Sequence, residues 1–221
     1  MLIGVFFGTC FYFSISHFYY AQFWGGPFIG ALVFIATYLF AYRGENRAED
    51  WLATIAGFGA MGVALFPTNG RGCDLASFSG RALADFKLSE NPIFVDVVPE
   101  TTADPYFELF STAHIFHFAS AALLFAFLAY FSIFVFTRVI QAKHRDSAGR
   151  LKRQKLVRNT IYLISGGLIL LSMAAMTLNA LFGFEGWDGA RLTFWSEAIA
   201  LWAFGASWIV KGRFFNLLLL D

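Results

Sequence analysis

Long apolar runs, each bounded by charged or turn-forming residues, limit what this 221-residue chain can fold into. A bilayer core about 30 Å thick is crossed by about 20 apolar residues in a helix, which satisfies all its backbone groups internally. The alternating pattern of a membrane β-barrel strand is absent from these runs. We therefore predict an all-α, polytopic integral membrane bundle of about six transmembrane helices. The six runs are at about residues 2–19, 27–42, 51–66, 110–137, 159–182 and 192–210.

The composition agrees with a lipid environment. Hydrophobic residues make up 58% of the chain and charged residues 14%, whereas soluble domains hold about 25% charged residues. These values exclude a secreted enzyme, a disulfide scaffold and a disordered tail. The lipid bilayer is the expected partner, and no nucleic-acid partner is expected.

The loops between the runs carry opposite charges, which predicts the orientation in the membrane. The 138–158 segment has eight basic residues and one acid, whereas the 67–109 loop has seven acids and three basic residues. Because cytoplasmic loops are enriched in Lys and Arg, we expect 138–158 to be cytoplasmic and 67–109 extracytoplasmic. Both termini are then expected to be cytoplasmic, and we expect residues 1–221 to form a single membrane domain.

Two segments need separate interpretation. The 2–19 run lacks a basic start and a small-residue cleavage pattern, so we interpret it as a span and not as a signal peptide. It begins abruptly, and we expect the native chain to start upstream of Met1. In the 67–109 loop, residues 91–98 alternate in part. This pattern is typical of a short strand or an interfacial segment, and we expect the loop to form a small cap over the outer mouth.

Small residues recur along the 51–66 run. Ala56, Ala60 and Ala64 are four residues apart, and Gly57 lies among them. Such spacing lets helix backbones approach closely, which favours association in lipid. We predict a central packing helix here, and a hinge is the alternative.

Strongly polar side chains gather where the predicted topology places the outer half of the membrane. Polar groups inside spans usually face the bundle interior or a wet cavity. We therefore predict an outward-facing polar pocket. The candidates are Ser16, His17, His114, His117, Asn179 and Glu197.

The two histidines of the 110–137 run allow three interpretations. His114 and His117 are three residues apart, on one helix face, and with Glu197 they would form a two-histidine, one-carboxylate set for zinc or iron. His17 would add a third nitrogen. In the simpler interpretation, His117 bonds Glu197 or Asn179 and pins helices together. A proton-handling or ligand-binding pair is the third, and the catalytic residues are unassigned in all three.

Several motifs, in order along most of the chain, resemble a bacterial family of uncharacterised multi-pass membrane proteins. The resemblance implies a multi-pass protein of the bacterial inner membrane. It implies no activity, because that family is itself a domain of unknown function. It implies that His117 and Glu197 occupy motif positions, whereas His17 and His114 depart from the pattern. Relatives also carry more residues before the first motif. The motifs are Ser14–Tyr20, Phe40–Gly44, Gly62–Thr68, His117–Ala122, Lys155 with Arg158–Tyr162, Phe194–Glu197 and Ala203–Gly212.

Three functions compete at this point. The first is a non-catalytic binding, sensing or accessory subunit whose outward pocket holds a lipid headgroup, a small ligand or another membrane protein. The alternative is a metal-dependent, membrane-embedded hydrolase acting on lipid, with metal-activated water. A small transporter is the second alternative, less favoured because inverted repeats are not evident in the sequence.

Overall fold

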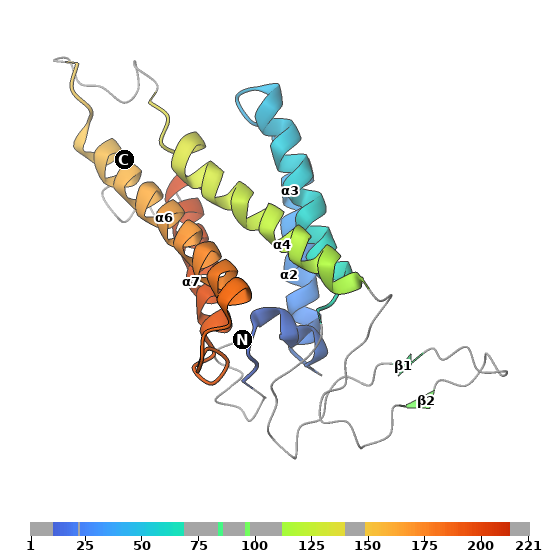
Figure 1. Ribbon diagram of the computed structural model, residues 1–221. Coiled ribbons are helices and arrows are strands. Elements are labelled where there is room, and N and C mark those ends of the chain that lie inside the picture. Colours follow the sequence, from blue (N-terminus) through green and yellow to red (C-terminus); the bar gives the residue numbers. More distant parts are fainter. Residues whose placement is uncertain are drawn as a thin grey trace. The chain divides into compact units, whose positions relative to one another are not determined.

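The computed structural model describes residues 11–21, 23–68, 84–85, 96–97, 112–139 and 149–212. Within these residues the regular elements are helices and two strands of two residues each (Figure 1). The elements are η1 (Ile15–Tyr20), α2 (Gly25–Ala41), α3 (Arg47–Leu65), β1 (Ala84–Asp85), β2 (Asp96–Val97), α4 (Ala113–Tyr130), η2 (Phe131–Val135), α6 (Arg153–Phe182) and α7 (Leu192–Gly212).

Two helical stretches are long and apolar enough to cross a membrane, judged by length and composition alone. They are Ala113–Val135, which joins α4 to η2, and Arg153–Phe182, with mean hydropathies of 2.2 and 2.0. Less than half of each is buried within the protein. Gly25–Ala41 is apolar but shorter. The predicted helical class is confirmed, and the two helices indicate membrane association.

The first apolar run differs from the prediction where the structure describes it. Residues 15–20 form the 3-10 helix η1, and not part of an α-helical span. Its N-cap is Ser14, whose Oγ accepts a hydrogen bond from the Ser16 amide at 3.1 Å. Such local side-chain bonds compete with the α-helical ladder. The first nine residues of the 2–19 run lie outside the described residues.

The strand pair lies in the 67–109 loop. β1 and β2 are antiparallel, with Ala84 opposite Val97 and Asp85 opposite Asp96. β2 falls within the 91–98 segment for which a short strand was one expectation. The predicted cap over the outer mouth lies outside the described residues.

The chain divides into two compact units, which we describe separately. Unit 1 comprises Met1–Leu124 with Asp188–Phe194, and unit 2 comprises Phe125–Trp187 with Trp195–Asp221. Within unit 1, α2 and α3 lie side by side (Figure 1).

A closed set of hydrogen bonds holds the short connection between α2 and α3. Asn46 is the N-cap of α3, and its side chain accepts from the Glu49 amide at 3.1 Å. The Glu49 carboxylate is buried and accepts from the Asn46 side-chain amide at 2.7 Å and from the Glu45 backbone amide at 3.1 Å. Reciprocal bonds of this kind satisfy orphan amide groups at a helix start.

The small residues of α3 form its buried face. Ala56, Gly57, Ala60 and Ala64 are all buried. A Cβ atom added at Gly57 would lie 2.7 Å from the Phe40 ring and 3.2 Å from the Ala36 carbonyl of α2. Glycine at this position therefore permits the close approach of the two helices.

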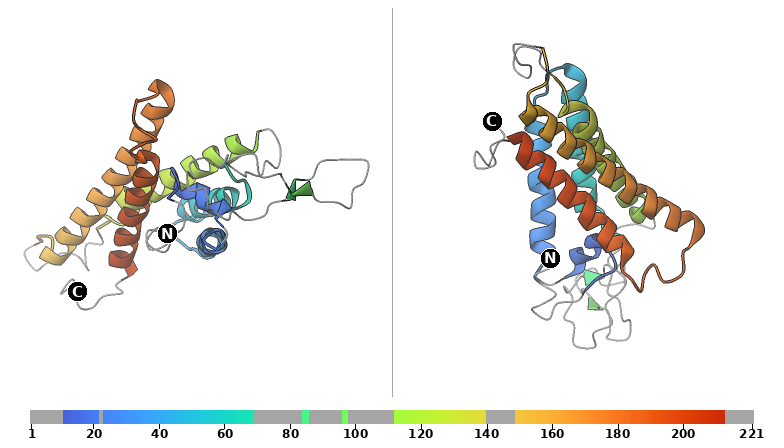
Figure 2. Two further views of the ribbon diagram at one scale, coloured as in Figure 1. Left: turned by 90° about the horizontal axis from the view of Figure 1, so that it is seen from below. Right: turned by 90° about the vertical axis from the view of Figure 1, so that its left-hand side faces the viewer.

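Unit 2 contains its own close contacts. A Cβ added at Gly166 of α6 would overlap the side chain of Ile133 in η2. Ser132 and Ser207, both fully buried, share a hydrogen bond of 3.0 Å between η2 and α7. Figure 2 shows α6 leading through a turn into α7. α6 ends at Phe182, and its C-cap residue Gly183 has a φ of 63°, which favours glycine.

Candidate functional site

A buried histidine connects three segments of unit 1. His117 lies on α4 and is 2% exposed. Its Nδ1 is 2.6 Å from the carbonyl oxygen of Phe66, the C-cap residue of α3. Its Nε2 is 2.9 Å from Oγ of Ser16, in η1. We call these three groups the His117 centre.

The Phe66 carbonyl determines the state of one ring nitrogen of His117. A carbonyl oxygen can only accept a hydrogen bond, so Nδ1 of His117 carries the hydrogen and donates it to Phe66. In the neutral imidazole, Nε2 then accepts a bond from the Ser16 hydroxyl. Both ring nitrogens are therefore saturated by groups of the protein itself.

Local sequence explains how the Phe66 carbonyl becomes available. The last carbonyls of an α-helix have no partner within the helix. Phe66 follows α3, with its amide bonded to the Gly62 carbonyl at 2.9 Å, and Pro67 stops the helix because proline disfavours helical geometry in the residue before it. The exposed carbonyl is then satisfied by His117.

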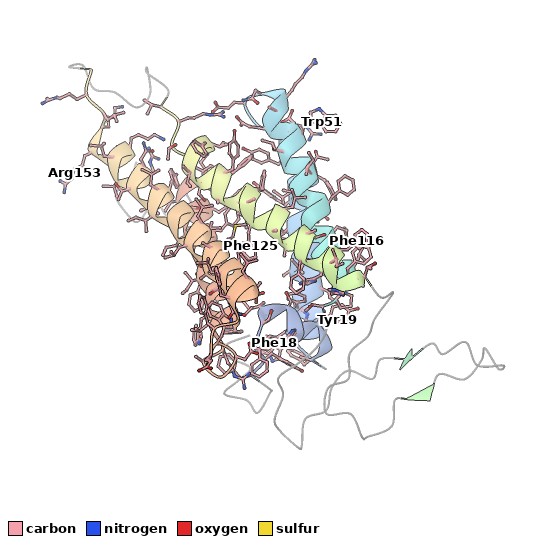
Figure 3. All side chains as sticks on the ribbon, in the orientation of Figure 1. Phe18, Tyr19, Trp51, Phe116, Phe125 and Arg153 are labelled. Atoms are coloured by element: carbon pink, nitrogen blue, oxygen red, sulfur yellow. The ribbon has the colours of Figure 1, made fainter. Side chains whose placement is uncertain are left out.

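An aromatic cluster packs around η1. Phe18 and Phe194 are buried, with ring centroids 6.2 Å apart, and Tyr12 contacts Phe18 at 5.0 Å. The Phe194 amide donates to the Phe13 carbonyl at 2.8 Å. Figure 3 shows Phe18 and Tyr19 on η1. These contacts fix the short 3-10 helix that carries Ser16, so the position of the hydroxyl is defined by packing.

The structure brings Ser16 and His117 together. The two other candidate histidines, His17 and His114, are close to them in the sequence but have different surroundings. His17 is half-buried, and its ring centroid is 6.4 Å from that of Tyr12. His114 is half-buried on α4, and among the described residues its buried Nδ1 has no hydrogen-bond partner.

Asn179 and Glu197 belong to unit 2. Asn179 is half-buried near the end of α6, where its Oδ1 accepts from the Phe184 amide at 3.1 Å. This bond is a local helix cap. Glu197 is half-buried on α7. The expected convergence of these two residues with His117 stays a prediction.

The metal hypothesis meets a specific obstacle. Among the described residues, no group of three or more His, Cys, Asp or Glu side chains could hold a metal ion. A metal ligand needs a free nitrogen lone pair, and at Nε2 of His117 that lone pair faces the Ser16 hydroxyl. A zinc or iron site at His114, His117 and Glu197 would require displacement of Ser16.

Sequence reasoning missed three polar groups that make hydrogen bonds within the protein. The carbonyl of Phe66 is a backbone group and gives no sequence signal. Lys155, which is 4% exposed, is hidden within the basic 138–158 segment. Glu49 did have a signal, because Asn46 three residues before it matches the pattern of an N-terminal capping box.

No family model matches the sequence, and no match is found among curated proteins or solved structures. The function must therefore be argued from the geometry of the chain.

Proposed function

We propose that the chain is a multi-pass protein of the bacterial inner membrane, of the uncharacterised family its motifs resemble. The proposed bundle has about six helices, cytoplasmic termini and an extracytoplasmic 67–109 loop. The charge distribution of the loops and the two long apolar helices support it. So do large apolar side chains on α6 that are well exposed, including Leu171 at 67%, Leu181 at 71% and Phe182 at 69%. Such a surface suits lipid and not water.

The proposed role is non-catalytic: a binding, sensing or accessory subunit with a polar site on the outward side. The saturation of both His117 nitrogens supports this role. A histidine whose nitrogens both bond the protein ties segments together, because no ring nitrogen is left for substrate or metal. The centre fixes η1 against α3 and α4, and thereby shapes the end of the unit where the ligand would bind.

His114 supplies the polar atom that such a ligand would use. It lies one turn before His117 on α4, and among the described residues its Nδ1 is buried without a partner. Buried polar atoms in native proteins usually have partners. A lipid headgroup, a small ligand or a partner membrane protein would satisfy this nitrogen.

Native mass spectrometry of the protein extracted in mild detergent tests this role. We expect a stoichiometric lipid or partner to be retained by the wild-type protein and lost from His114→Ala. The matched control is Ser120→Ala, two turns further along α4, which should retain it. Absence of any bound lipid or partner from the wild-type protein, or equal retention by His114→Ala, would contradict the role.

A serine hydrolase is the second candidate, favoured by the bond between Ser16 and His117. A nucleophile within hydrogen-bond reach of a base, with the base oriented by a third group, is the arrangement of activated serines. Here Ser16 Oγ would attack an ester carbonyl while Nε2 of His117 takes its proton and passes it to the departing alcohol. Water would then hydrolyse the acyl-serine with the same base, and the Phe66 carbonyl would hold the imidazole.

One hydrogen bond makes the serine hydrolase the less favoured candidate. The amide of Ser16 already donates to Ser14 Oγ at 3.1 Å, so the nucleophile's own amide is not available to an oxyanion. Labelling with diisopropyl fluorophosphate tests the activity. A serine hydrolase should be labelled at Ser16, and both Ser16→Ala and His117→Ala should abolish the labelling, whereas Ser120→Ala should not. An unlabelled wild-type protein excludes it.

Measurement of the metal content distinguishes the metal-dependent hydrolase from the non-catalytic subunit and from the serine hydrolase. That hydrolase requires stoichiometric zinc or iron in the purified protein and its loss in His117→Ala. Purified protein without either metal removes this alternative.

A further inference from the structure

Three cationic side chains lie close together at one end of unit 2. Lys155 and Arg158 come from the first turns of α6, and Lys211 comes from the last turn of α7. The Lys155 Nζ donates to the Phe136 carbonyl at 3.1 Å, and the Lys211 Nζ lies 5.4 Å from the centroid of the Phe136 ring. The positive charges of Lys211 and Arg158 are close enough to repel the ammonium group of Lys155. We call these three residues the basic cluster.

Aromatic rings line the protein side of the basic cluster. The ring of Phe136 contacts those of Tyr162 and Trp208, with centroids 5.5 Å and 5.4 Å apart. The Lys155 Nζ is 5.9 Å from the centroid of Tyr162. Cations over aromatic faces are attracted by the ring electrons, so the rings help to hold the ammonium groups in place.

The buried lysine retains donors that a ligand could use. Lys155 is 4% exposed, and a lysine ammonium has three N–H donors. The bond to Phe136 accounts for one of them, and within the described residues no other hydrogen bond of Lys155 is found. An incompletely bonded ammonium in such a buried position favours an anion beside it.

The start of α6 adds to the positive potential. Helix N-termini usually carry acidic residues, because the unpaired amides there attract negative charge. The first turn of α6 has no acid, and its N-cap residue Lys152 makes no side-chain capping bond. Figure 3 shows Arg153 at this end of α6, pointing away from the helix. Backbone dipole and side chains therefore attract anions together.

Apolar residues next to the cluster favour a lipid over a free anion. Leu156 and Val157 lie between Lys155 and Arg158 in sequence and are 50% and 41% exposed. α6 is also one of the two helices that could cross a membrane. A headgroup phosphate at the cations would place its acyl chains along such apolar surface.

We propose that Lys155, Arg158 and Lys211 bind the phosphate of an anionic phospholipid at this end of unit 2. Lysine supplies point charges and arginine a planar pair of donors, and both bind phosphate well. The site is independent of the His117 centre. The proposal rests on the proposed insertion of the protein in a membrane. It does not depend on the proposed outward ligand or on the orientation of the protein in the membrane.

Native mass spectrometry in detergent, with titrated dioleoylphosphatidylglycerol or dioleoylphosphatidylcholine, tests the site. We expect wild-type protein to bind phosphatidylglycerol more tightly than phosphatidylcholine. Each basic residue near an anionic surface changes affinity about fivefold, so Arg158→Gln/Lys211→Gln should weaken phosphatidylglycerol binding on the order of 25-fold. The matched control Arg47→Gln, an exposed cation of unit 1, should leave the affinity within about twofold.

Two further arms make the result decisive. Arg158→Lys/Lys211→Arg keeps both charges and should restore binding, which separates charge from misfolding. Inorganic phosphate, added alone, should compete only weakly. Equal affinity for the two lipids, unchanged phosphatidylglycerol binding in the double glutamine variant, or displacement of the lipid by equimolar inorganic phosphate would each overturn the proposal.

Discussion

The two units pack their helices in the same way but treat polar side chains differently. In unit 1, Gly57 lets α3 approach α2, and in unit 2 Gly166 lets α6 approach η2. The His117 centre of unit 1 is neutral and saturated, with each ring nitrogen bonded to the protein. The basic cluster of unit 2 brings positive charges together around Phe136.

This difference separates structural polar groups from ligand-binding ones. A polar group whose hydrogen bonds are all made within the protein stabilises the fold, because leaving it unmatched in an apolar interior is costly. Like charges held near one another oppose the fold until an anion joins them. The contrast assigns His117 to positioning and the basic cluster to binding.

Removal of the imidazole should have the largest effect on stability. His117→Ala leaves the Phe66 carbonyl and the Ser16 hydroxyl without their partner and creates a cavity at a site 2% exposed. We expect a loss on the order of 3 kcal/mol in the free energy of unfolding, measured in detergent micelles. His114→Ala, on the same helix, should lose less than about 1 kcal/mol. Equal losses would show that the His117 centre is not a special tie.

A pair of adjacent glycines tests whether unit 2 is packed closely. Gly166→Ala would push Cβ into Ile133, whereas at Gly167 nothing lies within 4 Å. Gly166→Ala should destabilise the protein by about 1–3 kcal/mol, and Gly167→Ala should stabilise it by up to about 1 kcal/mol because alanine favours helix. Thermal unfolding of the two variants measures both. Similar behaviour of the pair would contradict close packing of α6 against η2.

The serine pair of unit 2 should contribute less. A double-mutant cycle of Ser132→Ala and Ser207→Ala isolates the bond of 3.0 Å between their hydroxyls. Interhelical bonds in membranes average about 0.6 kcal/mol, and we expect a coupling of that size from unfolding in detergent. A coupling above about 2 kcal/mol would mean that the stability of unit 2, like that of unit 1, depends strongly on one buried polar contact.

Glu197→Gln should have the smallest effect. Because both nitrogens of His117 are already bonded to neutral groups, we expect loss of the Glu197 charge to change stability by less than about 0.5 kcal/mol. The same unfolding assay applies, with Glu185→Gln, an exposed carboxylate, as control. A loss of about 3–5 kcal/mol would instead indicate an ionised pair with His117, and the centre would not be neutral.

The long apolar runs predicted much of the helical architecture. The runs at 27–42, 51–66, 110–137, 159–182 and 192–210 each correspond to a helix, although α6 begins six residues earlier than its run. The type of helix was harder to predict from the sequence. Residues 15–20 belong to the apolar 2–19 run, but hydrogen bonds around Ser14 give a 3-10 helix. Apolar composition therefore predicts where helices form, and local hydrogen bonds decide the type of helix.

The candidate site was accessible only in part. Polarity within apolar runs drew attention to Ser16 and His117, which the structure joins. Their third partner is the backbone carbonyl of Phe66, which every residue type possesses and no sequence pattern marks. Lys155 falls in the basic segment that the sequence predicts to be cytoplasmic, and its burial could not be predicted because it depends on tertiary contacts with Phe136.

The π-helix η2 has a consequence for how this chain tolerates change in length. In η2 the Phe136 amide bonds the Phe131 carbonyl, five residues back, at 2.9 Å, so the segment holds one residue more per turn than an α-helix requires. Deleting one residue from Phe131–Val135 would let the ladder close as a regular α-helix. Each α-helical residue turns the chain by about 100°. The Phe136 carbonyl, which accepts the hydrogen bond from Lys155, would then point in another direction. The residues of the basic cluster themselves would be unchanged.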